Sequence, residues 1–173
     1  MCIRDRGNAY PTFEKGRKYL APGLFGPCGY GFPSILGAKI GCPKTPVIGF
    51  AGDGAFGISM NEMSSCAREE WPAISMVIFR NYQWGAEKRN TTLWFDDNFV
   101  GTELDPELSY AKVADACGLK GVTVRTMEET TAAILSLIHI SEPTRRTPIS
   151  YAVFCLKKRM QRRRPLPPCH NCV

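Results

Sequence analysis

Two short apolar runs, separated by a helical pattern, constrain the fold of this chain more than any other feature. Residues 47–51 (VIGFA) and 73–79 (AISMVIF) are almost entirely apolar, which is typical of strands buried on both faces of a parallel sheet. Between them, apolar residues recur at a helical period from Phe56 to Ala67, and a Trp-Pro pair at 71–72 ends the helix. This order of strand, helix and strand predicts a right-handed βαβ unit.

The flanking segments extend this unit to a larger α/β domain. Residues 34–41 (SILGAKIG) predict a helix of small residues before the first strand. Residues 81–104 are polar and aromatic without clear periodicity, and they predict a long ordered loop. A helix over 110–117, a strand over 122–124 and a helix from Met127 onward complete the pattern. We expect an open, Rossmann-like parallel sheet with helices on both faces, truncated at its C-terminal side.

The two ends of the chain are related to each other at the level of codons. Residues 1–6 read MCIRDR, residues 135–145 read LSLIHISEPTR and residues 149–158 read ISYAVFCLKK, and all three resemble translated adapter. ATG TGT ATA AGA GAC AGR encodes the first, and the reverse complement of ATGTGTATAAGAGACAG begins CTG TCT CTT ATA CAC, which encodes LSLIH. Both ends therefore resemble translated sequencing adapter. We expect a natural domain over about residues 7–134, adapter translation over 1–6, and an artefactual, disordered tail over 135–173.

The ends also determine the apparent class of the protein. The whole chain has a formal net charge of +6 and eight cysteines, which is typical of a basic nucleic-acid-binding or cysteine-rich module. Residues 7–134 hold 12 Lys and Arg against 14 Asp and Glu, a net charge of −2, and four cysteines whose spacings fit no zinc pattern. No apolar run is long enough to span a membrane. We therefore expect a cytoplasmic domain without a nucleic-acid or membrane partner.

A polar residue with a metal-binding side chain follows each of the two predicted strands. Asp53 lies within GDG (52–54), directly after the first strand, and Asn81 follows the second strand 28 positions later. The carboxyl ends of neighbouring parallel strands form the ligand crevice of open α/β sheets. Carboxylate and amide oxygens suit Mg²⁺ or Ca²⁺, and free N–H groups of the helix that starts near Ala55 favour a phosphate. The residues therefore predict a Mg²⁺-diphosphate site.

A GDG motif, some two dozen residues and an Asn pair at the end of a strand resemble the signature of thiamine-diphosphate enzymes. Here Arg80 stands in place of the first Asn, and Asn81 matches the second. The resemblance implies that Asp53, Asn81 and the main-chain carbonyl of Gln83 hold Mg²⁺. Cys28 falls where a bulky side chain usually bends the cofactor, and cysteine is small for that role. The implied cofactor-binding residues are Gly26, Cys28, Gly29, Gly52, Asp53, Gly54, Ala55, Phe56, Asn81, Gln83, Trp84 and Gly85.

Three longer stretches, residues 19–43, 49–63 and 79–104, resemble the C-terminal cofactor domain of the sulfoacetaldehyde acetyltransferase family. QWGAEK (83–88) and FVGTEL (99–104) are the most specific elements. That family converts sulfoacetaldehyde and phosphate to acetyl phosphate and sulfite, with thiamine diphosphate as the carbanion sink. The resemblance implies a homo-oligomer whose site lies between subunits and whose activating glutamate belongs to a separate domain. We therefore expect no catalytic residue in this chain, which would be inactive alone.

Other interpretations stay open at this point. The chain also fits a domain of an acetolactate-synthase-like or other thiamine-diphosphate carboligase or decarboxylase. A nucleic-acid-binding or cysteine-rich module built on the tail would lose its function on removal of residues 135–173. A fragment that does not fold by itself is a third alternative. Glu87, Lys88 and Arg89 are either phosphate or sulfonate contacts or a solvated charged turn.

Overall fold

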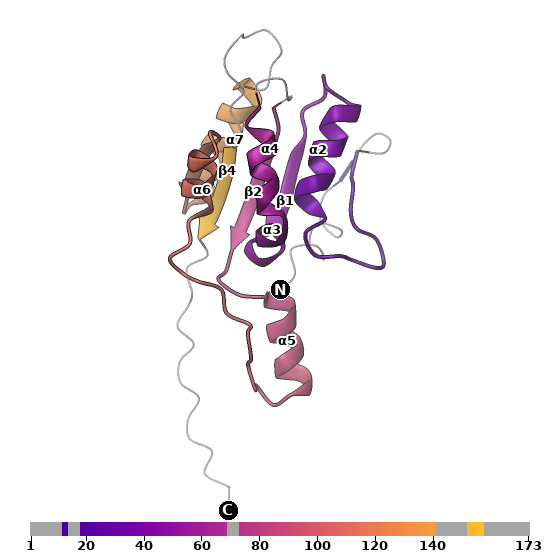
Figure 1. The fold of residues 1–173 in the computed structure, drawn as a ribbon, viewed down its shortest axis with the longest axis vertical. Coiled ribbons are helices and arrows are strands. Elements are labelled where there is room, and N and C mark those ends of the chain that lie inside the picture. The colour runs from indigo at the N-terminus through magenta and orange to yellow at the C-terminus, as the bar shows by residue number, and fades with distance from the viewer. Residues whose placement is uncertain (1–11, 14–17, 69–72, 141–151, 158–173) are drawn as a thin grey trace, which may run out of the picture.

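A parallel β-sheet forms the centre of the chain. The computed structural model describes residues 12–13, 18–68, 73–140 and 152–157. Within this part of the chain, the strands β1 (Ile48–Gly52), β2 (Ser75–Arg80), β3 (Lys120–Val124) and β4 (Ala152–Lys157) form one sheet in the order β1-β2-β4-β3. All three strand pairs are parallel (Figure 1). The expected α/β class with an open parallel sheet is confirmed.

Helices cover both faces of the sheet, as expected. On β2, Met76 and Ile78 belong to the core cluster on one face, whereas Val77 packs with Val124 and Ile134 on the other. The second face is covered by α7 (Met127–Ile140). The first face is covered by α2 (Gly31–Gly41), α3 (Asp53–Ser59), the 3₁₀ turn η1 (Met60–Glu62), α4 (Met63–Cys66) and α6 (Tyr110–Ala116).

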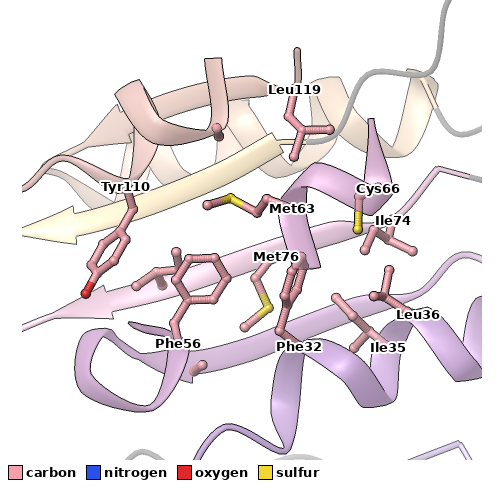
Figure 2. Packing of buried hydrophobic residues seen from close by; sticks show 13 residues of the cluster. Phe32, Ile35, Leu36, Phe56, Met63, Cys66, Ile74, Met76, Tyr110 and Leu119 are labelled. Carbon is pink, nitrogen blue, oxygen red and sulfur yellow. The ribbon is translucent and has the colours of Figure 1, made fainter. Parts of the chain in front are cut away.

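An aromatic contact joins three helices in the larger core cluster. Phe56 of α3 is 1% exposed and makes edge-on ring contacts with Phe32 of α2, at 5.2 Å, and with Tyr110 of α6, at 5.3 Å (Figure 2). Met63 and Met76 fill the space beside these rings. Burial of rings of this size is a large share of the favourable folding free energy, because hydrophobic stabilisation scales with the apolar area removed from water. The core therefore fixes α3, and with it the residue that begins α3.

The register of β1 and β2 places the ends of both strands side by side. Gly52 lies opposite Phe79, so the residues after these two, Asp53 and Arg80, are also neighbours at the carboxyl edge. The remaining helix, α5 (Gly85–Trp94), lies beyond this edge, past the ends of the strand arrows in Figure 1. The sheet thus presents the GDG motif and the loop after β2 to the same region, as the predicted βαβ unit requires.

Two predicted elements differ from the structure. The single helix expected after GDG is divided into α3, η1 and α4, and it ends at Cys66; residues 71–72, the predicted stop, lie outside the described residues. The loop predicted over 81–104 contains α5, a helix without a buried residue. Because none of its side chains faces a core, α5 has no apolar periodicity, and the pattern from which helices are predicted is absent.

Two parts of residues 135–173, the expected artefactual tail, belong to helices and strands that the structure describes. The helix α7 continues to Ile140, and Ala152–Lys157 form β4 between β2 and β3. The sequence AVFCLK is rich in residues that favour strands, and β2 and β3 flank this position, so β4 satisfies main-chain groups of both strands. Residues 1–6, 141–151 and 158–173 lie outside the described part. Within the described part, no helix combines the length and apolar character needed to cross a membrane.

Candidate functional site

Asp53 is the buried centre of the candidate site. It directly follows β1 as the first residue of α3, and its side chain is 2% exposed. Oδ2 accepts hydrogen bonds from the main-chain N–H groups of Asn81 (3.2 Å) and Tyr82 (2.7 Å), and Oδ1 accepts one from Gly54 (3.2 Å). Burial raises the pKa of the Asp53 carboxyl, and these N–H donors oppose that rise. The carboxylate is therefore held in one orientation toward the loop that follows β2.

Three oxygen atoms converge beside Asp53. The side-chain oxygen of Asn81 faces two acceptors, Asp53 Oδ1 and the main-chain oxygen of Gln83. With the amide rotated by 180°, its nitrogen would lie 3.0 Å from each of them and donate to both. The Asn81 amide thus has two orientations: one in which its nitrogen donates to both oxygens, and one in which its own oxygen faces them. The second orientation is favourable only when a cation lies between the oxygens, because each oxygen is an acceptor.

The spacing of these oxygens suits a small divalent cation. Mg²⁺ binds oxygens at about 2.0–2.1 Å in octahedral geometry, so neighbouring ligand oxygens are about 2.9 Å apart. The 3.0 Å distances from the Asn81 amide to Asp53 Oδ1 and to the Gln83 main-chain oxygen are compatible with such an ion. Within the described residues no group of three His, Cys, Asp or Glu side chains could hold a metal, so the site depends on one carboxylate and two neutral oxygens.

A short antiparallel pairing fixes the loop that carries Asn81 and Gln83. Gln83 forms a bridge with Glu103, the Tyr82 carbonyl accepts from Leu104 N–H at 2.9 Å, and Trp84 N–H donates to the Thr102 carbonyl at 2.8 Å. Tyr82 has a φ of 60°, in the left-handed region, which is uncommon for a large side chain. Such a conformation persists only when its surroundings enforce it. The hydrogen bonds to residues 102–104 therefore hold the strained turn at Tyr82, and this turn sets the direction of the Gln83 carbonyl.

The glycines of GDG allow the chain to pass close to Trp84. A Cβ on Gly54 would lie 2.9 Å from the Trp84 indole, so any other residue would displace the ring. Trp84 is the residue before α5, and Gly85 is the first residue of that helix. Gly52 is half-buried and precedes α3 in extended conformation. The structure therefore brings together the residues predicted from GDG and from the loop after β2.

The predicted glycine-rich segment lies beside α3. Gly26 and Gly29 have φ values of 58° and 85°, which glycine adopts without steric cost. A Cβ on Gly29 would lie 2.9 Å from Ile58, and Ser59 Oγ donates to the Gly29 carbonyl at 3.1 Å. Cys28 is exposed, with a free thiol. The contacts with Ile58 and Ser59 hold Gly29 against the C-terminal half of α3.

Other predicted residues have side chains that are occupied or face away from a ligand. The side chain of Phe56 lies in the core, so only its main chain is available, whereas Ala55 is half-buried. Lys88 forms an ion pair with Glu103 and lies over the ring of Phe99, 4.9 Å from its centroid. Glu87 and Arg89 are exposed. Lys88 therefore ties α5 to the segment that also pairs with Gln83.

Sequence patterns did not identify two tyrosines that hold Asp53. Tyr82 N–H donates to the Asp53 carboxylate, and the hydroxyl of Tyr110 donates to the Asp53 main-chain oxygen at 2.9 Å. Tyr110 is 3% exposed. It was predicted only as the start of a helix, and it meets Asp53 across 57 positions of the sequence. A contact at that separation has no local sequence signal.

Comparisons with known proteins concern the family of the chain. The profile of the family described as "Thiamine pyrophosphate enzyme, C-terminal TPP binding domain" matches residues 2–145. The "Probable sulfoacetaldehyde acetyltransferase" of Rhizobium meliloti (strain 1021) is 80% identical over 132 residues, which are 76% of this chain and 22% of that protein. The "Sulfoacetaldehyde acetyltransferase" of Roseovarius nubinhibens is 73% identical over 128 residues, 74% of this chain and 21% of that protein.

A solved structure has the same fold. The "thiamine diphosphate-dependent 4-hydroxybenzoylformate decarboxylase" of Rhodococcus jostii RHA1 superposes with a TM-score of 0.65 at 23% identity, over 75% of this chain and 23% of that one. At this identity the likeness concerns the fold alone. The chain spans about a fifth of the length of the curated relatives that it matches.

Proposed function

The chain belongs to the thiamine pyrophosphate enzyme family, and on this basis we propose that it binds Mg²⁺ and thiamine diphosphate as the C-terminal domain of a sulfoacetaldehyde acetyltransferase. One observation carries the metal part of this proposal: the Asn81 side-chain amide lies 3.0 Å from both Asp53 Oδ1 and the Gln83 carbonyl oxygen, which are oxygen ligands of the kind that Mg²⁺ binds. Mg²⁺ ordinarily completes its coordination with phosphate oxygens and water. A diphosphate is thus the expected partner of the remaining positions.

Within this site the chain's own residues bind and orient. Asp53 would supply the single negative charge, and its buried carboxylate is held in place by hydrogen bonds from main-chain N–H groups. The Asn81 amide oxygen and the Gln83 carbonyl, directed by the turn at Tyr82, would be the neutral ligands of a bound metal. The Trp84 indole lies against Gly54 and shields one side of the GDG backbone. Thiamine diphosphate, when bound, supplies carbanion stabilisation.

We propose the substrates from the relatives. The high identity to sulfoacetaldehyde acetyltransferases supports sulfoacetaldehyde and phosphate as substrates of the whole enzyme, with acetyl phosphate and sulfite as products. The chain spans about a fifth of those proteins, so the activating glutamate would belong to another domain of a cytoplasmic homo-oligomer. We assign the natural domain to about residues 7–134. This chain alone would then bind the metal and diphosphate without turnover.

The binding part is tested by calorimetric titration of the chain with thiamine diphosphate in excess Mg²⁺ and again in EDTA. We expect binding that requires the metal and that Asn81→Ala weakens. The control is Asn61→Ala, which truncates an exposed amide away from the site. Binding of equal strength in EDTA, or equal loss in both variants, would contradict the assignment of the metal ligands.

The substrate part is tested on a full-length protein that contains this domain. We expect acetyl phosphate from sulfoacetaldehyde and phosphate, and little carboligation of pyruvate. Preference for pyruvate would favour the acetolactate-synthase-like alternative. Acetyl phosphate formation by the chain alone would contradict the need for a second domain.

A further inference from the structure

We propose that Arg80 is a positioning residue for the cation site: it holds the two tyrosines that fasten Asp53 and thereby sets the geometry of the metal ligands. This inference rests on the proposed Mg²⁺ site. Arg80 is the last residue of β2, directly before Asn81, and it is 8% exposed. Its side chain points to the same face of the sheet as Ile78 and Met76, two and four positions earlier, because side chains alternate along a strand.

The buried guanidinium of Arg80 is bound by main-chain oxygens and aromatic rings. Nη2 donates to the carbonyls of Asp105, at 3.2 Å, and Pro106, at 3.0 Å. The guanidinium carbon lies 4.3 Å from the centroid of the Tyr82 ring and 5.8 Å from that of Tyr110. A buried cation attracts both the negative faces of aromatic rings and carbonyl oxygens. Arg80 therefore joins three segments that are distant in the sequence.

Both rings beside Arg80 belong to residues that hold the same aspartate. Tyr82 N–H donates to Asp53 Oδ2 at 2.7 Å, and the Tyr110 hydroxyl donates to the Asp53 main-chain oxygen at 2.9 Å. The carbonyls that Arg80 binds directly follow Leu104, whose N–H donates to the Tyr82 carbonyl. Arg80 thus links the two tyrosines that contact Asp53 to the segment at Asp105 and Pro106.

These contacts bear on metal geometry through Tyr82. Its φ of 60° is a strained conformation that surrounding contacts must enforce. Without the guanidinium, we expect Tyr82 to lose its left-handed conformation for part of the time, which would turn the Gln83 carbonyl away from Asp53 and Asn81. Mg²⁺ and Mn²⁺ need near-octahedral ligands, whereas Ca²⁺ accepts irregular geometry. Loss of Arg80 should therefore weaken Mn²⁺ binding more than Ca²⁺ binding.

The test is a metal titration of the full chain with saturating thiamine diphosphate. Free Mn²⁺ is measured by electron paramagnetic resonance, and Ca²⁺ affinity follows from competition with Mn²⁺. The variants are Arg80→Met, which removes the charge and the donors, and Arg80→Lys, which retains the charge but not the planar fork. The matched control is Arg68→Met, the same change at an exposed arginine. Melting temperatures are recorded for all variants.

We expect Arg80→Met to weaken Mn²⁺ binding by about tenfold or more, the usual effect of removing a residue that supports metal ligands, with a smaller loss for Ca²⁺. Arg80→Lys should lie between Arg80→Met and the wild type, and the control should match the wild type.

Three results would overturn the inference. One is Mn²⁺ affinity in folded Arg80 variants equal to that of the control. Another is an equal loss for Mn²⁺ and Ca²⁺, which would indicate a general structural role. If Arg80→Met does not fold, Arg80→Lys decides: unfolding of this variant too, or an unchanged ratio of affinities, would also refute a positioning role. Absence of Mn²⁺ binding by the wild-type chain would instead overturn the proposed function itself, and this inference with it.

Discussion

The substitution Asp53→Asn separates the stability of the fold from the stability that the cofactor adds. Asparagine has nearly the shape of aspartate, and its oxygen can still accept from the N–H groups of Asn81 and Tyr82, whereas its amide nitrogen cannot accept from Gly54 N–H. The variant loses charge-assisted hydrogen bonds, but it also loses the desolvation that raises the pKa of the carboxyl. These effects oppose each other. We therefore expect the metal-free variant to be as stable as the wild type to within about 1 kcal/mol, the net value of one hydrogen bond.

Bound cofactor should make the wild-type chain more stable than the Asp53→Asn variant. A ligand at 100 times its dissociation constant stabilises the folded state by about 2.7 kcal/mol. For a domain of this size, 1 kcal/mol corresponds to about 3–4 °C, so Mg²⁺ and thiamine diphosphate should raise the melting temperature of the wild-type chain by about 10 °C. Asp53 provides the only charge among the three protein oxygens that face the metal position. We expect the shift in Asp53→Asn to be below about 2 °C at the same concentrations.

The assay is thermal unfolding followed by circular dichroism, with Mg²⁺ and thiamine diphosphate, with each alone, and with EDTA. Asp96→Asn is the matched control, because Asp96 is exposed and its left-handed backbone is one that asparagine accepts. The control should show the full shift. An equal shift in Asp53→Asn and the wild type would refute Asp53 as a metal ligand. A large loss of metal-free stability in Asp53→Asn would refute the expectation that relieved desolvation offsets the lost charge-assisted hydrogen bonds.

Three further predictions concern residues around the site and in the core. Tyr110→Phe removes the buried hydrogen bond to the Asp53 carbonyl, so urea unfolding should show a loss of about 1 kcal/mol with little change in the slope. Gly54→Ala should lower the free energy of unfolding by about 1–3 kcal/mol and alter tryptophan fluorescence, because its Cβ would lie 2.9 Å from the Trp84 indole. The control Gly57→Ala, in the same helix, should leave the free energy of unfolding unchanged or raise it by up to about 1 kcal/mol, since its Cβ would make an ordinary contact at 3.4 Å. Burial raises the pKa of the Cys66 thiol from 9.0 to about 12, so above pH 9 the unfolded chain releases a proton that the folded chain retains. Stability should therefore fall as pH rises from about 9 to 12, by up to about 1.4 kcal/mol per pH unit, and Cys66→Ala should lack this component in urea titrations.

The sequence predicted the fold where burial dictates residue type. The strands β1 and β2 lie within two residues of their predicted positions, because strands buried on both faces require continuous apolar runs. Helix α5 was missed for the opposite reason, since it buries no side chain and is held by contacts such as the Lys88–Glu103 ion pair. β4 was missed because the origin inferred for the tail argued against structure, although a strand-forming sequence fits the gap between β2 and β3.

The sequence could predict those site residues that directly follow a strand. Asp53 and Asn81 could be paired from the sequence because parallel neighbours end at one edge. The carbonyl of Gln83 was predicted from the family resemblance alone, because any residue type has a main-chain carbonyl. Arg80 stood out only as a departure from the family motif. Its contacts with Tyr110 and Pro106 depend on packing between distant segments, and no spacing rule predicts such contacts.

The place of β4 in the sheet has a consequence for the order of folding events. β4 follows the other three strands in the chain, yet it pairs on both sides, with β2 and β3. Until β4 joins the sheet, β2 and β3 would therefore present two open strand edges at once, and such edges recruit other chains. The contacts that close the sheet join strands far apart in the sequence, since β2 begins at Ser75 and β4 at Ala152. Folding of this sheet should thus be slow relative to that of proteins with mainly local contacts.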